Sequence, residues 1–121
     1  MSIKYDEYDL LELFGAEPIA IVDQITGIFL YNQVKKNGLE LFFKFSTYED
    51  SCSITLYLNS AVVASVSLED VISFVREEYS LRITLRNSDV QYLLHFRPSY
   101  CIEVVSHPKP EFPGSVSITS N

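Results

Sequence analysis

The sequence predicts a mainly β protein: an antiparallel β-sandwich or a curled, barrel-like sheet of eight to nine strands, with one short N-terminal helix. Apolar and polar residues alternate with a period of two from Leu39 to Val104, as in strands that bury one face. Turn signals such as Asn37-Gly38 and Asn59-Ser60 separate the alternating runs at hairpin spacing. No helical pattern of crossover length lies between the runs, which excludes a parallel, doubly wound fold.

The helix is predicted over Asp6–Phe14. Asp6 is a suitable N-cap, and the acids that follow it suit the positive end of the helix dipole. Leu10, Leu13 and Phe14 form one apolar stripe, and Gly15 offers a left-handed residue at which the helix can end. Because so short a helix is unstable alone, we expect it to cover one open end of the sheet structure.

Six of the alternating runs have a clear apolar side. In chain order these sides are Leu39, Leu41, Phe43 and Phe45; Cys52, Ile54, Leu56 and Leu58; Val62, Ala64, Val66 and Leu68; Leu81, Ile83 and Leu85; Val90, Tyr92, Leu94 and Phe96; and Tyr100, Ile102 and Val104. Ile19–Val22 and Ile28–Tyr31 are shorter apolar runs before them. Val71–Arg76 follows Glu69-Asp70, which also resembles a helix start, but its β-branched and aromatic residues favour a strand.

From these sides we predict a core that includes Leu41, Phe43, Phe45, Ile54, Leu56, Val66, Ile83, Leu85, Leu94, Phe96 and Ile102. With 121 residues, of which 47% are hydrophobic, the chain is expected to form a single domain. We place this β-rich domain at residues 1–106. The Pro- and Ser-rich tail at residues 107–121 is expected to be loosely ordered.

The charge of the chain narrows the class of partner. Nine Lys and Arg residues against sixteen Asp and Glu residues give a net charge of −7. A protein that binds phosphates directly needs a basic footprint, so nucleic acid and anionic membranes are unfavourable partners. An acidic surface suits a basic partner, although the same charge also serves solubility.

The N-terminus shows no secretory signal, and no apolar run is long enough to cross a membrane. Cys52 and Cys101 lie in apolar alternating segments and lack metal-ligand spacing. We therefore expect both to be buried, reduced residues of a cytoplasmic protein, with a disulfide as the alternative.

The sequence lacks the motifs of most enzyme classes. It has no glycine loop for nucleotides and no His, Cys or acidic cluster at metal spacing, so no cofactor and no metal are expected. Hairpin geometry places His95 near Glu103, which favours a cross-strand contact over an acid–base pair. The expectation is a protein that is not an enzyme.

Two segments carry the candidate partner-binding residues. They are Asp6, Glu7, Asp9 and Glu12 on the helix, and Tyr48, Glu49 and Asp50 in the loop after the third strand. Exposed tyrosines with carboxylates suit a partner rich in Lys and Arg. The competing site is a basic face of Arg76, Arg82, Arg86 and Arg97 beside His95, which salt bridges to neighbouring acids would instead neutralise.

Three stretches resemble a known family: YDEYDLLELFGAEPIAIVD (residues 5–23), FSTYEDSCSITLYL (residues 45–58) and HFRPSYCIEV (residues 95–104). Together they are similar to small bacterial immunity proteins of contact-dependent growth inhibition and other polymorphic toxin systems. The resemblance covers roughly residues 5–105, and the tail departs from it. It implies a cytoplasmic protein that binds a cognate toxin domain, often a nuclease, and blocks its active site or an exosite without doing chemistry.

Two other classes stay open from the residues. A curled sheet with many inward Phe and Leu side chains would also suit a small apolar-ligand-binding β-barrel, which would show an apolar cavity. A regulatory subunit of another complex is the third class. The sequence does not indicate an oligomeric state.

Overall fold

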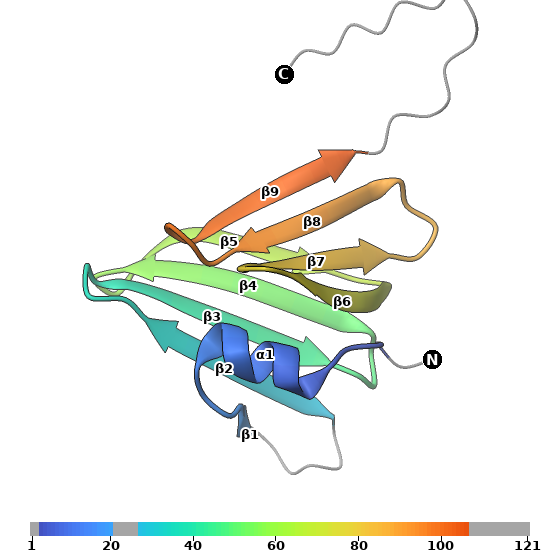
Figure 1. The fold of residues 1–121 in the computed structure, drawn as a ribbon. Coiled ribbons are helices and arrows are strands. Elements are labelled where there is room, and N and C mark those ends of the chain that lie inside the picture. The colour runs from blue at the N-terminus through green and yellow to red at the C-terminus, as the bar shows by residue number, and fades with distance from the viewer. Residues whose placement is uncertain (1–2, 21–26, 107–121) are drawn as a thin grey trace, which may run out of the picture.

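The computed structural model describes residues 3–20 and 27–106, which form one helix and nine strands in two sheets (Figure 1). The elements are the helix α1 (Glu7–Phe14); a five-stranded sheet of β1 (Ile19–Ala20), β2 (Ile28–Val34), β3 (Leu39–Ser46), β4 (Ser51–Leu58) and β5 (Ala61–Leu68); and a four-stranded sheet of β6 (Val71–Glu77), β7 (Ser80–Leu85), β8 (Val90–His95) and β9 (Cys101–Ser106). Neighbouring strands are antiparallel and follow one another in sequence order.

This arrangement confirms the predicted mainly β fold. Of the two predicted architectures it is the sandwich, because within the described residues the two sheets are separate and do not close into a barrel. The segment from Val71 is a strand, as its composition favoured. The predicted tail at residues 107–121 lies outside the described residues, as does the part of the run Ile19–Val22 beyond Ala20.

The predicted turns close the hairpins of the first sheet. Gly38 has φ +87°, and a Cβ there would collide with the Asn59 side chain, so both the backbone angle and the space require glycine. Asn59 and Ser60 both have positive φ, 49° and 71°, which is the conformation of tight hairpin turns. The turn residues therefore fix the register in which β2 pairs with β3 and β4 pairs with β5.

Helix α1 begins and ends as predicted. The Asp6 side chain accepts a hydrogen bond from the backbone of Tyr8, and Gly15 (φ 72°) donates its N–H to Leu11 at 2.7 Å. Its stripe of Leu10, Leu13 and Phe14 is buried. The helix contacts both β2 and β6, so it covers the open side of the sandwich between the two sheets (Figure 1).

The inner faces of the sheets meet in one aromatic cluster. Phe43 and Phe45 of β3 each pack against Phe74 of β6, with ring centroids 5.1 Å apart in both pairs. Phe14 of the helix contacts Phe43 at 5.7 Å and Phe96, after β8, at 5.0 Å. The space between the sheets is therefore filled by rings contributed by four separate parts of the chain.

Most of the predicted core residues are buried. They are Leu41, Phe43, Phe45, Ile54, Leu56, Ile83, Leu94 and Phe96, while Val66, Leu85 and Ile102 are partly buried and pack against the cluster. Ile3, Tyr31, Val71, Phe74 and Leu81 are also buried, although the predicted core did not include them.

The segment before the helix extends the second sheet. Lys4 forms an isolated parallel bridge with Ser73. Its N–H donates to the Ile72 carbonyl at 3.0 Å, and its carbonyl accepts from the Phe74 N–H at 2.9 Å. The edge of β6 is therefore covered by residues that lie far from it in the sequence.

Four expected burials need correction. Leu58 and Val104 were placed on the apolar sides of their strands but are 41% and 58% exposed, because Leu58 is the last residue of β4 and Val104 lies on the edge strand β9. Val62 was expected on the apolar side of its strand but is 58% exposed, because a register shift at Leu56/Tyr57 places it opposite Tyr57. Cys101 was expected to be buried but is exposed, since it lies on the edge strand β9, whereas Cys52 is buried. Both cysteines are free.

Candidate partner-binding surface

The acidic residues of the helix have different surroundings. Asp6 is the N-cap, and its Oδ1 accepts a hydrogen bond from the Tyr8 N–H at 2.8 Å. Glu12 forms an ion pair with Arg76 of β6, with 2.5 Å between Oε1 and Nη1. Asp6 and Glu12 therefore stabilise the fold in addition to carrying charge. Glu7 and Asp9 present carboxylates in the first helical turn.

The loop between β3 and β4 holds its three candidate residues differently. Tyr48 is 85% exposed, and Glu49 is also exposed, with its N–H donating to Ser46 Oγ at 3.1 Å. Asp50 has φ 53°, and its carbonyl accepts from the Val71 N–H at 2.8 Å. Asp50 is therefore part of the junction between the sheets, whereas Tyr48 and Glu49 face outward.

The start of the helix and this loop lie at the same end of the sandwich (Figure 1). Tyr5, directly before the N-cap, packs edge-on against Phe45, the penultimate residue of β3, with ring centroids 5.0 Å apart. The sequence did not indicate whether the two candidate segments were neighbours. The structure brings them to one end of the molecule.

A groove between the helix and β2 adds residues that the sequence analysis did not select. It has a volume of about 330 Å³, and the residues that line it include Tyr5, Tyr8, Phe29, Tyr31, Glu7 and Glu17. We call it the helix groove. The density of tyrosine and acid in the first residues was the available signal, but the contribution of β2 depends on how the helix packs.

Two arginines of the competing basic site pair with acids of the first site. Arg76 meets Glu12 of the helix, and Arg86 lies 3.7 Å from the Asp50 carboxylate. The two candidate sites suggested by the sequence are therefore joined by ion pairs, and the charges involved are partly neutralised.

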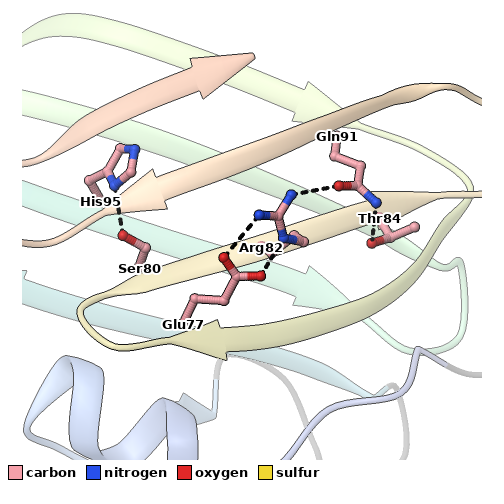
Figure 2. Close-up of polar contacts among 6 residues, drawn as sticks. All are labelled: Glu77, Ser80, Arg82, Thr84, Gln91 and His95. Atoms are coloured by element: carbon pink, nitrogen blue, oxygen red, sulfur yellow. Dashed lines mark hydrogen bonds and ion pairs between the residues drawn. The ribbon is translucent and has the colours of Figure 1, made fainter. Parts of the chain in front are cut away.

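The other two arginines lie apart from each other, and Arg97 lines one groove together with Arg76. The Arg97 guanidinium lies over the Tyr79 ring, 4.1 Å from its centroid. Arg82 lies on the outer face of the second sheet with His95 (Figure 2). The four arginines therefore do not form one continuous basic face.

Arg82 is the centre of a polar network on that outer face (Figure 2). It binds Glu77 through two nitrogens, at 2.5 Å (Nε–Oε2) and 2.9 Å (Nη2–Oε1), and donates to Gln91 Oε1 at 2.6 Å. Gln91 in turn donates to Thr84 at 3.4 Å. Hydrogen bonding to Arg82 lowers the pKa of Glu77, so Glu77 stays ionised. The charges of Glu77 and Arg82 therefore neutralise each other.

His95 contacts its neighbours on both sides across the sheet. Its Nε2 lies 2.7 Å from Glu103 Oε1, which confirms the expected cross-strand contact, and its Nδ1 lies 2.6 Å from Ser80 Oγ. The serine contact was not foreseen. In serine hydrolases the acid binds Nδ1 and the serine binds Nε2, so the order of contacts here is the reverse.

Within the described ranges, no group of three or more His, Cys, Asp or Glu residues is arranged to hold a metal ion. None of the described helical residues forms a segment long and apolar enough to cross a membrane.

The fold and the surface define a small β-sandwich whose candidate site is an open surface of acids and tyrosines. No family model matches the chain, and no curated protein is significantly similar to it in sequence. Among solved structures, it is similar to one chain of a "Contact-dependent growth inhibition toxin - immunity protein complex from Klebsiella pneumoniae 342". The two chains are 25% identical with a TM-score of 0.75, and the match covers 88% of this chain and 100% of that chain. This likeness confirms the resemblance to immunity proteins that the sequence indicated.

Proposed function

We propose that this protein is an immunity protein of a contact-dependent growth inhibition system, which binds a cognate toxin domain and keeps it inactive. The observation that carries the proposal is the likeness to a chain of a toxin–immunity complex, which extends over the whole of that chain. The protein then acts by binding and not by catalysis. Its place is the cytoplasm, where an incoming toxin would meet its target, and it contacts neither membrane nor nucleic acid directly.

The proposed toxin is a nuclease. A nuclease that grips a polyanion carries a basic cleft, and a protein with a net charge of −7 complements such a cleft. The immunity protein would cover the active site or an exosite, and its charge would speed the encounter.

The proposed binding surface is the acidic end of the molecule. It comprises the residues selected from the sequence: Asp6, Glu7, Asp9, Glu12, Tyr48, Glu49 and Asp50. The contacts described above support different roles for them, because Asp6, Glu12 and Asp50 have structural partners. Glu7, Asp9, Tyr48 and Glu49 would therefore make most of the direct contacts.

The toxin itself is the first test. The open reading frame beside this gene should encode a toxin C-terminal domain, and purified toxin domain and immunity protein should form a stable complex. Co-expression should rescue cells from the toxin. A neighbouring toxin domain that neither binds the protein nor is neutralised by it would contradict the proposal.

The surface has its own test with single charge reversals. Glu49→Lys should weaken toxin binding roughly tenfold or more, partly through slower, salt-dependent association. Glu78→Lys is the matched control, since Glu78 is exposed in the turn between β6 and β7, at the opposite end of β6 from the Asp50 contact, and the net charge changes equally. Arg97→Glu tests the competing basic residues. Loss of binding in Arg97→Glu but not in Glu49→Lys would move the interface away from the acidic end.

A further inference from the structure

We infer that the helix groove receives one cationic side chain, a lysine or an arginine, of the toxin domain. The inference rests on the proposed function and specifies a point of contact within it. It is carried by the walls of the groove, by an unpartnered hydroxyl at the groove and by the charges around it.

The walls of the groove suit a cation on a long aliphatic stem. Tyr5, Tyr8 and Phe29 offer ring faces and edges to the methylene groups and to the charged head. Glu7 and Glu17 supply carboxylates that accept charge-assisted hydrogen bonds from an ammonium or guanidinium group. Tyr8 is 77% exposed, so one wall of the groove is accessible from solvent.

The hydroxyl of Tyr31 could accept a hydrogen bond from a donor in the groove. The residue is only 3% exposed, and its ring is held in the core by Phe14, with centroids 4.9 Å apart. Across residues 3–20 and 27–106, its hydroxyl has no hydrogen-bond partner, yet Tyr31 lines the groove. Because this hydroxyl accepts no hydrogen bond from those residues, an N–H that enters the groove would find a free acceptor in it.

The local charge favours a cation and disfavours an anion. Burial raises the pKa of Tyr31 to about 12, and the negative charges of Glu7 and Glu17 add to this effect. The hydroxyl therefore stays neutral at physiological pH and accepts an N–H without adding a charge.

The other end of the helix has the opposite character. A second groove of about 410 Å³ there is lined by Lys35, Arg76 and Arg97 together with Glu12. Three cations against one carboxylate repel a basic side chain. The two grooves would therefore orient a toxin surface along the helix, with its basic side chain at the N-terminal end.

The groove is tested first without any toxin. N-acetyl-arginine amide is titrated into the ¹⁵N-labelled protein at millimolar concentration, with N-acetyl-citrulline amide as the neutral probe of the same shape. We expect saturable shifts around Tyr5–Leu11 and Phe29–Tyr31 for arginine and none for citrulline. Equal responses to both probes, shifts spread over the whole acidic surface, or no shift at all would overturn the inference.

The second experiment measures toxin binding with two double variants that change the net charge equally. Glu7→Gln with Glu17→Gln removes the two groove carboxylates, and Glu78→Gln with Glu103→Gln changes two exposed glutamates of the second sheet by the same charge. We expect the first pair to weaken toxin binding by about tenfold or more and the second to have little effect. Tyr31→Phe keeps the core ring and should weaken binding severalfold.

The outcomes separate the inference from the proposed function. If toxin binds and both double variants bind equally well, the groove is not a point of contact and the proposed function stands. If the wild-type chain binds no toxin, the proposed function fails, and the preference of the groove for a cation is decided by the arginine titration alone.

Discussion

The hydroxyl of Tyr100 donates a hydrogen bond to Gln33 Oε1, 2.5 Å away, and so joins the loop before β9 to strand β2 of the other sheet. The amide nitrogen of the same glutamine donates to the carbonyls of Leu13 and Phe14, both at 3.1 Å. These are carbonyls of the last helical turn, which need partners from outside the helix. One side chain therefore connects the helix and both sheets.

Replacing this glutamine should destabilise the fold more than its single contacts suggest. Gln33→Leu is expected to lower the free energy of unfolding by about 2–3 kcal/mol. It removes the donor to two helix carbonyls and leaves the Tyr100 hydroxyl only its longer contact, 3.4 Å, with the Gln33 backbone carbonyl. Tyr100→Phe removes one hydrogen bond and should cost about 1 kcal/mol. Urea unfolding measures both. A Gln33→Leu loss no larger than that of Tyr100→Phe would show that the helix carbonyls gain nothing from Gln33.

Adjacent phenylalanines in β3 should differ in their effect on stability. Phe43 is fully buried and contacts Phe14, Phe45 and Phe74, so Phe43→Ala should cost about 3–5 kcal/mol. Phe42 lies on the opposite face, half-buried, with a ring contact to Tyr57 at 5.3 Å. Phe42→Ala should therefore cost clearly less. Equal losses in chemical denaturation would contradict the assignment of the inner face.

Stability should fall in alkali. Burial raises the pKa of Tyr100 and of Tyr31 from 10.0 to about 12 each, and that of Cys52 from 9.0 to about 12. The folded state therefore holds these protons more tightly than the unfolded state does. The stabilisation is complete below the unfolded values, 9.0 for the thiol and 10.0 for the phenols, and is lost as pH rises toward about 12.

The variant Tyr31→Phe checks the alkaline prediction. Thermal unfolding of this variant should show a shallower decline between pH 10.0 and about 12 than the wild type, since one of the raised groups is gone. Parallel declines in the two proteins would assign the alkaline loss to other groups.

The two cysteines should react at very different rates. Cys101 is exposed on the edge strand, whereas Cys52 is buried and its pKa is raised to about 12. An aromatic disulfide reagent should therefore modify one thiol per native chain, and mass spectrometry of peptides should locate it at Cys101. Unfolding should release the second. Prompt modification of both thiols in the native protein would contradict the burial of Cys52.

The period-two pattern predicted the strands because it is local, and the sheets follow it closely. It failed at Val62, where a bulge reverses which side faces the core, since a bulge depends on pairing with β4 and leaves no mark in the alternation. The direction of the Arg76 side chain could not be predicted from the alternation either. Its place opposite buried Leu81 turns it toward the helix and away from the outer face that carries Arg82.

The candidate site was predictable in composition but not in geometry. The acids and Tyr48 were visible as exposed polar residues of a helix and a loop. That Asp50 meets Arg86 depends on how the loop packs against the other sheet. Tyr31 lines the helix groove because of where the whole helix packs. The spacing of apolar residues in the sequence does not predict that position.

The bridge between Lys4 and Ser73 has a consequence for the order of events during synthesis on the ribosome. The hydrogen bonds of Lys4 require Ile72 and Phe74, so a segment translated early cannot take its place until β6 has emerged. Hairpins β2 to β5 can form as they leave the ribosome, because their partners are close in sequence. In the nascent chain Phe43 and Phe45 therefore lack their contact with Phe74 until β6 has emerged, and the segment at Lys4 closes the sandwich afterwards.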